Sequence, residues 1–279
     1  MNFVVVGGGP TGIELAGAFG ELKNHILPRD YPELDINKMQ IHIIDMMPRL
    51  LYTMSEEASR KTKEFLENFG VNVWLNTKVT VYNGKTLTLD NGKKVLNLNA
   101  ITVIWAAGVK GRILSGLEKA TIIRNRYKVD EYNRIEGYEN IFAIGDVAAI
   151  ITKENPLGHP MVAPVAMQQG RLLAQNLKNL MQKKKIKLFS YHDKGMMATI
   201  GRNRAVVDLG FLKFQGAFAW FIWMFVHLIY LVGFRNRLVV FVNWAWNYFS
   251  YDRGIRLIIR PFRKQAASLE SEPIKPSAD

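Results

Sequence analysis

The stretch that decides the fold begins at residue 3 and reads Phe3-Val-Val-Val-Gly-Gly-Gly-Pro-Thr-Gly-Ile-Glu-Leu-Ala-Gly17. An apolar run, a glycine cluster and an amphipathic segment in this order are typical of a buried strand, a tight turn and a helix. Gly7, Gly9 and Gly12 fit the G-x-G-x-x-G spacing, in which one glycine allows the turn, one lets the backbone approach a pyrophosphate and one lets helix pack on strand. The free N–H groups and dipole of the helix N-terminus favour an anion there. The sequence therefore predicts a dinucleotide site at the N-terminal edge of the chain.

A second apolar strand, Met39-Gln-Ile-His-Ile-Ile-Asp45, ends in a carboxylate that suits a ribose diol. This acid favours NAD(H) over NADP(H), although Arg49 nearby leaves the second cofactor open. The gap from Gly12 to Asp45 exceeds the usual twenty or so residues, and we assign the excess to residues 24–38. A glycine-rich turn that binds nothing remains the alternative.

Composition excludes several kinds of chemistry. The chain has 279 residues, which allows two domains, and 48% of them are hydrophobic, which is enough to form real cores. It contains no cysteine, which excludes disulfides, thiolate metal sites and cysteine nucleophiles within this chain. The five histidines show no zinc-like spacing, so no metal site is predicted; they are His25, His42, His159, His192 and His227.

The formal charge of +13 predicts an anionic partner. Basic residues crowd into the last hundred positions, around two strongly apolar, Trp-rich stretches, and this arrangement favours a phospholipid surface over nucleic acid. The run Lys183-Lys-Lys-Ile-Lys187 by itself fits a solvated loop as well as it fits lipid contact.

The first apolar stretch, 214–234, has 21 residues without a formal charge, which is long enough to span a bilayer. The second, 238–251, is too short to span. We expect two helices joined near residues 233–237 that lie in the membrane interface, with a true span and a buried soluble helix or oligomer contact as the alternatives.

Along the rest of the chain the pattern is mainly α/β. The expected strands are 3–6, 41–44, 71–75, 86–89 and 101–105, with a helix over 56–69 and a small antiparallel hairpin at 85–90 between two Asn-Gly turns. The chain is expected to leave the nucleotide fold near residues 106–108, to form a new strand over 136–146 and to form a helix over 167–181. Residues after Lys264 are predicted to be a disordered tail.

Further motifs extend this pattern. Three segments follow the glycine fingerprint in the order seen in two-dinucleotide-domain flavoprotein reductases. They are Trp105-Ala-Ala-Gly-Val109, Asn140-Ile-Phe-Ala-Ile-Gly-Asp-Val-Ala148 and Ala163-Pro-Val-Ala-Met-Gln-Gln-Gly170. Together with Lys194-Gly-Met-Met-Ala-Thr-Ile-Gly-Arg-Asn-Arg204 and Trp244-Ala-Trp-Asn-Tyr-Phe-Ser-Tyr-Asp-Arg253, the chain resembles the type II NADH dehydrogenases, single-subunit NADH:quinone oxidoreductases. The resemblance covers residues 1 to about 263.

The resemblance implies an α/β fold: a Rossmann-like NADH domain of a two-dinucleotide-domain flavoprotein, then part of its FAD domain and a C-terminal amphipathic helical membrane-binding region. The expected boundaries are 1–108 for the NADH-binding domain, 109–200 for the part of the FAD-binding domain, 201–264 for the membrane-associated region and 265–279 for the tail.

The resemblance also implies site residues. Gly7, Gly9 and Gly12 match the NADH fingerprint and Asp45 its ribose-binding acid, while Glu14 matches an acid near nicotinamide and flavin. Ala107 and Gly108 match a segment close to both cofactors, and Gly145 and Asp146 match the signature whose Asp binds the FAD ribityl or pyrophosphate portion. Gln168 and Gln169 match the glutamine pair beneath the isoalloxazine and beside the quinone head, and Lys194 matches a lysine near the flavin ring.

Each assignment has a structural alternative. Asp146 could cap the following helix, and Gln168 and Gln169 could be helix-surface amides. An acid in a helix's first turn, such as Glu14, is favoured by the dipole alone. Ala107-Gly108 could be only a strand-end turn.

By resemblance, the reaction is hydride transfer from NADH to FAD and then two electrons to a membrane ubiquinone or menaquinone, without proton pumping. The expected place is the cytoplasmic face of the cell membrane, bound peripherally to anionic phospholipid, with a homodimer also compatible. Pro164 replaces a glutamine often found in the family. The family's first fingerprint, for the FAD ADP moiety, has no match, so we expect a C-terminal portion of a longer enzyme that by itself holds FAD weakly or not at all. The rivals are another FAD-dependent pyridine-nucleotide reductase and a non-catalytic, membrane-associated NAD-binding fragment.

Overall fold

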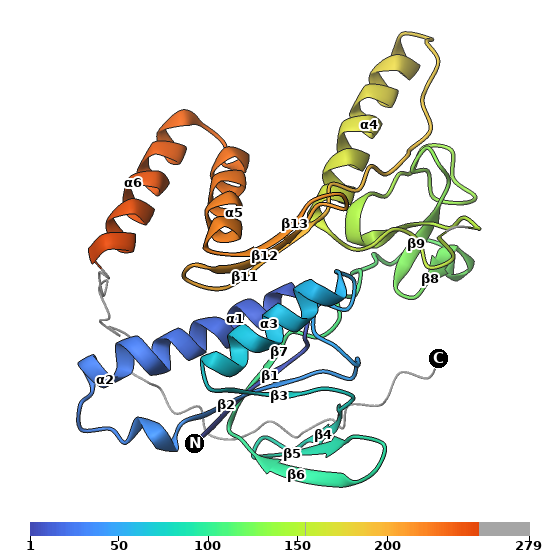
Figure 1. The fold of residues 1–279 in the computed structure, drawn as a ribbon. Helices are drawn as coiled ribbons and strands as arrows, with labels where there is room; N and C mark the ends of the chain where they lie inside the picture. Colours follow the sequence, from blue (N-terminus) through green and yellow to red (C-terminus); the bar gives the residue numbers. More distant parts are fainter. Residues whose placement is uncertain (154, 251–279) are drawn as a thin grey trace, which may run out of the picture. The chain divides into compact units, whose positions relative to one another are not determined.

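A computed structural model describes residues 1–153 and 155–250 (Figure 1). The described residues divide into two compact units, which are described separately: residues 1–107 with 195–250, and residues 108–194. The predicted tail after Lys264 and the basic residues beyond position 250 lie outside the described residues.

The first unit is built on a parallel sheet in the order β3-β2-β1-β7. Its strands are β1 (Asn2–Val6), β2 (Gln40–Ile44), β3 (Val71–Trp74) and β7 (Thr102–Trp105). The strands predicted at 3–6, 41–44, 71–75 and 101–105 are confirmed to within a residue or two. The buried side chains of β1 and β2 explain why these runs are mainly apolar on both faces, as parallel strands covered on both faces are.

Helices α1 (Pro10–Glu21) and α3 (Glu56–Asn68) cover one face of this sheet (Figure 1). The predicted helix over 56–69 is confirmed, and the Ser55 hydroxyl caps it by accepting the N–H of Ala58. After α1 the chain continues as a π-helix (Leu22–Ile26), the short α2 (Leu27–Asp30) and a 3₁₀ turn (Ile36–Lys38). These helical turns are the excess residues between the fingerprint and Asp45.

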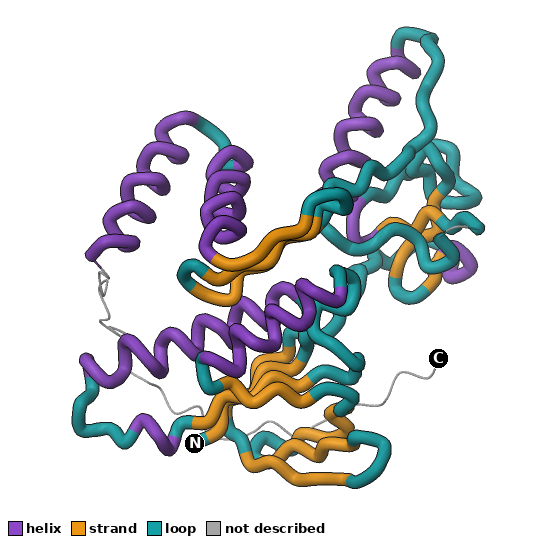
Figure 2. The backbone as a smooth tube through the Cα atoms, viewed as in Figure 1, coloured by secondary structure: helices purple, strands orange, loops and turns teal. Residues whose placement is uncertain are grey.

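An antiparallel meander covers the other face of the parallel sheet, through β4 (Lys78–Tyr82), β5 (Thr86–Asp90) and β6 (Val95–Asn99). Leu87 and Leu89 of β5 pack against Val4 and Ile44 in one apolar cluster. The predicted hairpin at 85–90 is confirmed as the centre of this larger three-stranded sheet, with turns at Gly84 and Gly92 (Figure 2).

A second antiparallel sheet, which the sequence analysis did not foresee, lies on the outer side of α1. It is formed by β11 (Met196–Gly201), β12 (Arg204–Asp208) and β13 (Lys213–Gly216). Val206 packs with the core around α1, whereas Ala205 and Val207 pack with Ala219 of the following helix, so both faces of β12 are buried. The alternation of side chains along a strand makes this double burial possible.

The C-terminal part of this unit is a pair of helices, α5 (Ala217–Tyr230) and α6 (Phe234–Ser250). The prediction of two helices joined near residues 233–237 is confirmed. The 21-residue uncharged stretch does not form one helix, because residues 213–216 pair in β13 and the backbone turns at Gly216 with φ +83°. Within the described residues, the 14-residue α5 and the 17-residue α6 included, no helix is long and apolar enough to cross a bilayer.

The second unit packs a small sheet against a long helix. The sheet has the order β10-β9-β8, with β8 (Ile122–Ile123), β9 (Arg126–Val129) and β10 (Ala148–Ile150). One 3₁₀ turn, Lys119–Thr121, precedes β8, and another, Gly145–Val147, precedes β10. Helix α4 (Ala163–Met181) confirms the predicted helix over 167–181 and begins four residues earlier, with Pro164 in its first turn.

The strand predicted over residues 136–146 is wrong. The chain reverses at Gly137, where φ is +83°, and the Ile135 N–H bonds the Ile141 carbonyl across this turn. Isolated bridges, such as that of Arg134 with Phe142, form in place of a ladder. Ala143 lies in the core of this unit, but the turns at Gly137 and Gly145 keep the apolar run between them too short for a strand.

His42 in β2 is a buried histidine with a fixed neutral form. It is 7% exposed, its Nδ1 accepts the Trp74 Nε1–H at 3.1 Å, and its Nε2 lies 3.3 Å from the Asn2 Oδ1. An indole only donates, so Nδ1 must be unprotonated. Burial lowers the pKa of His42 accordingly.

We expect the free energy of unfolding to fall as the pH drops below about 6.5, the ordinary histidine pKa, because the unfolded chain then takes up a proton that folded His42 resists. This contribution is complete above that pH and is lost progressively toward the lower pKa of the folded state. Urea unfolding between pH 7.5 and 5.5 should show a weaker pH dependence for His42→Gln than for the unchanged chain. His25→Gln, at an exposed histidine, is the control; an unchanged pH dependence in His42→Gln would contradict the fixed neutral form.

Candidate nucleotide-binding site

The carboxyl ends of three parallel strands meet at one edge of the first unit's sheet. Strand β1 leads into Gly7, β2 into Asp45 and β7 into Ala106. The Gly7 N–H bonds the Ile44 carbonyl and the Ala106 N–H bonds the Val6 carbonyl, so the three ends are held in register. Strand order reverses beside β1, and in open α/β sheets ligands bind at such a point.

Two fingerprint glycines are required by the fold itself. Gly7 has φ +116°, and a Cβ there would lie 2.8 Å from the Ala106 carbonyl group. A Cβ on Gly12 would lie 1.8 Å from the Gly7 carbonyl oxygen, so only glycine lets α1 approach the turn this closely. These are the steric reasons that the sequence analysis gave for the first and last glycines.

Gly9 differs from these two, because nothing in the described structure requires glycine at this position. Its φ is −77°, which any residue adopts, and a Cβ there would meet no atom within 4 Å. Among the glycines in the described part of the chain, no other combines an ordinary φ with such open space. A glycine that neither backbone conformation nor packing requires is expected where a ligand approaches the backbone closely.

The N-terminus of α1 next to Gly9 is uncapped. Gly9 is the N-cap residue and offers no side chain, and no side-chain hydrogen bond caps this helix end. The N–H groups of the first helical turn therefore lack intrahelical acceptors, and the dipole adds positive character at the same point. The first turn also contains no acidic residue that would repel an anion.

Gly8 and Asp45 are joined, which the sequence analysis missed. The Asp45 carboxylate accepts the N–H of Gly8 through Oδ2 and the N–H of Met47 through Oδ1 at 2.7 Å. A Cβ on Gly8 would lie 2.7 Å from Asp45 Oδ2 and from the Leu50 side chain. Three successive glycines in the sequence were the available signal that the middle position is also sterically required.

Arg49 is engaged with protein atoms. Its guanidinium Nη1 donates to the Met54 carbonyl at 2.7 Å and to the Ser59 hydroxyl at 2.8 Å, and it lies over the Tyr52 ring. These contacts hold the loop that leads into α3. The arginine that left NADP(H) open in the sequence analysis therefore has a structural use here.

Glu14 lies in the second turn of α1, facing β11. Its expected place in the first turn is corrected, because the helix begins at Pro10. Burial raises the pKa of the Glu14 carboxyl, while hydrogen bonds from Thr199 and the nearby charge of His227 lower it, with a net increase. The dipole explanation weakens beyond the first turn, so the half-buried position of this acid has no helix-capping explanation.

Ala107 and Gly108 follow β7 at the same edge. The Ala107 carbonyl accepts the Trp105 Nε1–H at 2.8 Å, and Ala107 packs with the cluster beneath the meander. Gly108 turns the chain with φ +78° and a Cβ there would meet no atom within 4 Å. Ala107 and Gly108 thus form a turn at the end of β7, which was the alternative to a cofactor contact. Their contact with a cofactor stays a prediction.

In the second unit, Gln169 holds the turn that carries Gly145 and Asp146. Gln169 is 1% exposed, and its Oε1 accepts the Gly145 N–H at 2.6 Å. Gly145 has φ +69°, and a Cβ there would lie 3.2 Å from Ala166. Asp146 is exposed, and no hydrogen bond of its side chain is found within the described ranges 1–153 and 155–250; it does not cap the 3₁₀ turn. The carboxylate is thus presented outward from a rigid turn.

Gln168 is bonded to the backbone of His192 in both directions. Its Nε2 donates to the His192 carbonyl at 2.9 Å and its Oε1 accepts the His192 N–H at 3.0 Å. Neither glutamine is therefore a free surface amide. Lys194, two residues further on, is exposed at the end of this unit.

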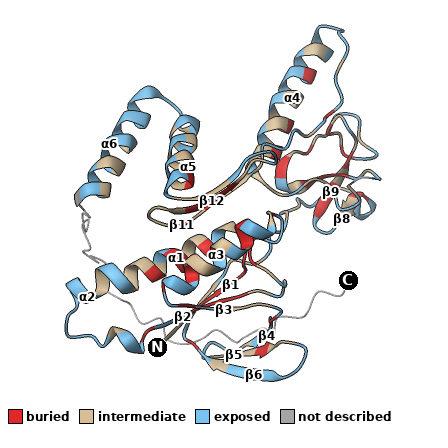
Figure 3. Cartoon of the chain, in the orientation of Figure 1, coloured by how far each residue is buried: buried red, intermediate tan, exposed pale blue. Residues whose placement is uncertain are grey.

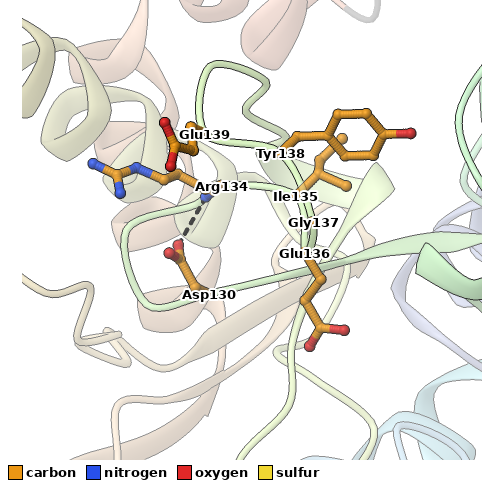
Figure 4. A pocket seen from close by; sticks show the side chains of 7 residues that line it. All are labelled: Asp130, Arg134, Ile135, Glu136, Gly137, Tyr138 and Glu139. Atoms are coloured by element: carbon orange, nitrogen blue, oxygen red, sulfur yellow. Dashed lines mark hydrogen bonds between the residues drawn. The ribbon is translucent and has the colours of Figure 1, made fainter.

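An open pocket of about 350 Å³ lies on the loop after β9, lined by Asp130, Arg134, Ile135, Glu136, Gly137, Tyr138 and Glu139. Figure 4 shows that Asp130 turns back to bond the N–H of Arg134, at 2.8 Å, and so shapes the loop. None of the residues predicted from the sequence lines this pocket. No group of three metal-ligating side chains was found among the residues that the structure describes.

Residues 1–170 match the sequence profile of the pyridine nucleotide-disulphide oxidoreductase family. The chain belongs to this family. Residues 193–250 match the NDH2 C-terminal domain, and this second match confirms the resemblance to type II NADH dehydrogenases.

Characterised relatives agree with this placement. The type II NADH:quinone oxidoreductase Ndh of Mycobacterium tuberculosis is 31% identical over 266 residues, covering 91% of this chain and 56% of the relative. The type II NADH:quinone oxidoreductase of Staphylococcus aureus is 34% identical over 214 residues, covering 74% of this chain and 51% of the relative. The chain thus spans about half the length of the curated relatives it matches.

The fold also matches a solved structure. NDH2 from Plasmodium falciparum in complex with NADH superposes with a TM-score of 0.81 at 24% identity, over 89% of this chain and 66% of the other. At this identity the match concerns the fold alone, and it confirms the mixed α/β class predicted from the sequence.

Proposed function

We propose that this chain is the NADH-binding and quinone-facing part of an FAD-dependent NADH:quinone oxidoreductase that pumps no protons. The observation that carries the proposal is that glycine occupies position 9, although neither backbone conformation nor packing in the fold requires it there. Gly9 lies at the N-terminus of α1, which no side chain caps, at the carboxyl edge of a parallel sheet. The pyrophosphate of NADH binds at this turn, where the amides of the first helical turn are free of intrahelical partners.

Asp45 and Arg49 set the preference for NADH. The carboxylate of Asp45 is fixed by two backbone N–H groups and keeps lone pairs for the hydroxyls of the adenosine ribose. A 2′-phosphate in the same place would meet this negative charge, and the guanidinium of Arg49 is directed to Met54 and Ser59. NADH is therefore favoured over NADPH.

The second unit fits a flavin contact. Asp146 is an exposed carboxylate with no side-chain hydrogen bond to the described residues 1–153 and 155–250, and it lies on a turn that Gln169 fixes from the core. This arrangement suits hydrogen bonding to hydroxyls of the FAD ribityl chain. FAD, when bound, would accept a hydride from NADH and pass two electrons to the quinone. Ala107, Gly108, Gln168 and Lys194 are the further positions that we assign to the surroundings of the ring and the quinone head.

Glu14 is the residue that we assign to proton transfer. Overall, NADH, one proton and a quinone give NAD⁺ and a quinol, because the hydride of NADH accounts for two electrons and one of the two hydrogens, so one further proton must be supplied. Because burial raises the pKa of Glu14, its carboxyl holds a proton at a higher pH than a surface glutamate does and can donate it from the carboxyl oxygen.

The helices α5 and α6 form the surface that meets the lipid phase in this proposal. These helices and the connection between them expose many large apolar side chains, including Phe218, Phe225, Val232, Phe234, Trp246 and Phe249 (Figure 3). Arg235 and Arg237 lie beside them at the start of α6. Apolar and aromatic side chains bordered by arginines suit peripheral binding to anionic phospholipid, at the cytoplasmic face of the cell membrane. The same exposed side chains also fit a homodimer contact.

The test measures NADH oxidation coupled to a soluble quinone analogue, with added FAD and detergent. It is made on this chain and on the longest polypeptide that its reading frame encodes, because the chain spans about half of its curated relatives. We expect NADH binding by both, with turnover and a flavin absorbance spectrum where FAD is held.

Binding of NADH without turnover in either polypeptide would instead favour a non-catalytic, membrane-associated NAD-binding protein. Turnover with a disulfide or ferredoxin acceptor and none with quinones would favour another pyridine-nucleotide reductase. Failure to bind NADH at all would overturn both the function and the assignment of Gly9.

A further inference from the structure

The free end of α4 and the loop that follows it form a strongly basic projection of the second unit. This projection, residues 178–188, is called the lysine tip below, and it carries Lys178, Lys183, Lys184, Lys185 and Lys187. No acidic residue occurs between Arg171 and His192. In Figure 1, α4 extends away from the rest of its unit, and the chain returns along it after the loop.

Two asparagines hold the lysine tip in a defined shape. Asn176 is 2% exposed, its Nδ2 donates to the Lys187 carbonyl at 2.8 Å and its Oδ1 accepts the Lys187 N–H at 2.9 Å. Asn179 Nδ2 donates to the Lys185 carbonyl at 3.0 Å, and the Lys184 N–H bonds the Asn179 carbonyl. The backbone of the lysine run is therefore folded back on α4, which argues against an unstructured solvated loop.

Apolar side chains are exposed among these lysines. Met181 is 88% exposed and Leu188 is 53% exposed, and Leu177 and Leu180 on the last turns of α4 are each about two-fifths exposed (41% and 42%). Figure 3 shows the end of α4 and the following loop as largely exposed surface. Lysines alone suit any polyanion, but exposed methionine and leucine side chains gain only from an apolar environment. A surface that combines both kinds of side chain is typical of lipid headgroup and acyl boundaries.

We propose that the lysine tip is a second lipid-binding surface, which docks on anionic phospholipid with its lysines at the headgroup phosphates and Met181 and Leu188 inserted below them. It belongs to residues 108–194, whereas the surface assigned above to the lipid phase belongs to α5 and α6. The inference goes beyond the proposed function, because it requires neither NADH nor quinone.

The absence of cysteine from the sequence permits a clean local test. A single cysteine is introduced by Gln182→Cys, at an exposed side chain of the lysine tip, and labelled with an environment-sensitive fluorophore. Lys93→Cys, at an exposed position of the β5–β6 turn, carries the same label as a control. With vesicles of phosphatidylglycerol and phosphatidylcholine, we expect a blue shift at position 182 and none at position 93, and no shift with phosphatidylcholine alone.

A charge variant of the labelled chain carries Lys183→Asn, Lys184→Gln and Lys185→Gln. Asparagine is chosen at position 183 because φ there is +54°, which asparagine tolerates. The matched control removes the same charge elsewhere, by Lys85→Gln, Lys93→Gln and Lys94→Gln on the meander. We expect the lipid concentration for the half-maximal shift to rise at least about tenfold in the first variant and little in the control.

Two outcomes would overturn the proposal. The label at position 182 could stay in water while the chain sediments with anionic vesicles, which would assign membrane binding to α5 and α6 alone. Alternatively, the label could respond to single-stranded RNA and not to vesicles, which would make the lysine tip a nucleic-acid contact. Neither outcome depends on NADH oxidation, so failure here and failure of the proposed function are distinguishable.

Discussion

Replacing Gly9 by valine should weaken NADH binding at least about tenfold, equal to about 1.4 kcal/mol, while the chain stays folded. The reason is that the valine side chain enters space that no protein atom occupies within 4 Å of the first added carbon, next to the N-terminus of α1. No backbone strain accompanies the change, because φ is −77°, and the added Cβ meets no protein atom within 4 Å. The bulk instead occupies the place that we assign to the pyrophosphate. Energy transfer from tryptophan to NADH measures the dissociation constant.

Two further variants make this result interpretable. Valine is a poorer N-cap than glycine, and this costs the helix at most about 1 kcal/mol, whereas Gly9→Ser provides a favoured N-cap and should keep or raise the unfolding temperature. Both variants should weaken NADH binding. Ala18→Val, at an exposed position of the same helix, should leave binding unchanged. Wild-type affinity in Gly9→Val would remove the main support for the nucleotide site.

The second large effect is expected at Gly17, where α1 and β11 touch. A Cβ at this position would lie 1.7 Å from the Ile200 carbonyl oxygen, so any side chain forces the helix and the second sheet apart. We expect Gly17→Val to lower the free energy of unfolding by about 3 kcal/mol, the upper part of the range for overpacked cores. Urea unfolding gives this quantity, and limited proteolysis should show earlier cleavage after residue 195.

Ala18→Val is again the matched control, because it adds two methyl groups to the adjacent, exposed residue of α1. It should cost about 0.5 kcal/mol through helix propensity alone. Equal losses in the two variants would show that α1 and β11 do not approach as closely as the structure has them.

Local patterns were sufficient for most elements of the first unit. The apolar runs of β1, β2 and β7 predicted strands, and the Asn-Gly turns at 83–84 and 91–92 predicted the meander's central strand. Residues 196–216 gave no such signal. Both faces of β12 are buried, so its sequence shows no alternation of apolar and polar side chains, and its neighbour β13 has only four residues. The strand expected at 136–146 failed because the turn at Gly137 outweighed the apolar composition of the run.

The candidate site divides in the same way. The spacing of Gly7, Gly9 and Gly12 was readable because it depends on residues near one another in the chain. The bond from Asp45 to Gly8, the engagement of Arg49 and the two-way bond between Gln168 and His192 were not readable, since each joins groups whose proximity is set by folding.

The sequence by itself determined the strand–turn–helix unit at the N-terminus, the acid that follows the second strand, the helical pair at positions 217–250 and the basic character of the chain. These features depend on local sterics, on the periodic spacing of apolar side chains and on charge, and each of these can be determined from residues that are close together in the sequence. Only the tertiary structure decided that Gly9 is free of the protein whereas Gly7, Gly8, Gly12 and Gly17 are not. That distinction depends on which atoms from distant segments lie within a few ångströms of each Cα, and close packing between segments is settled only when the chain folds.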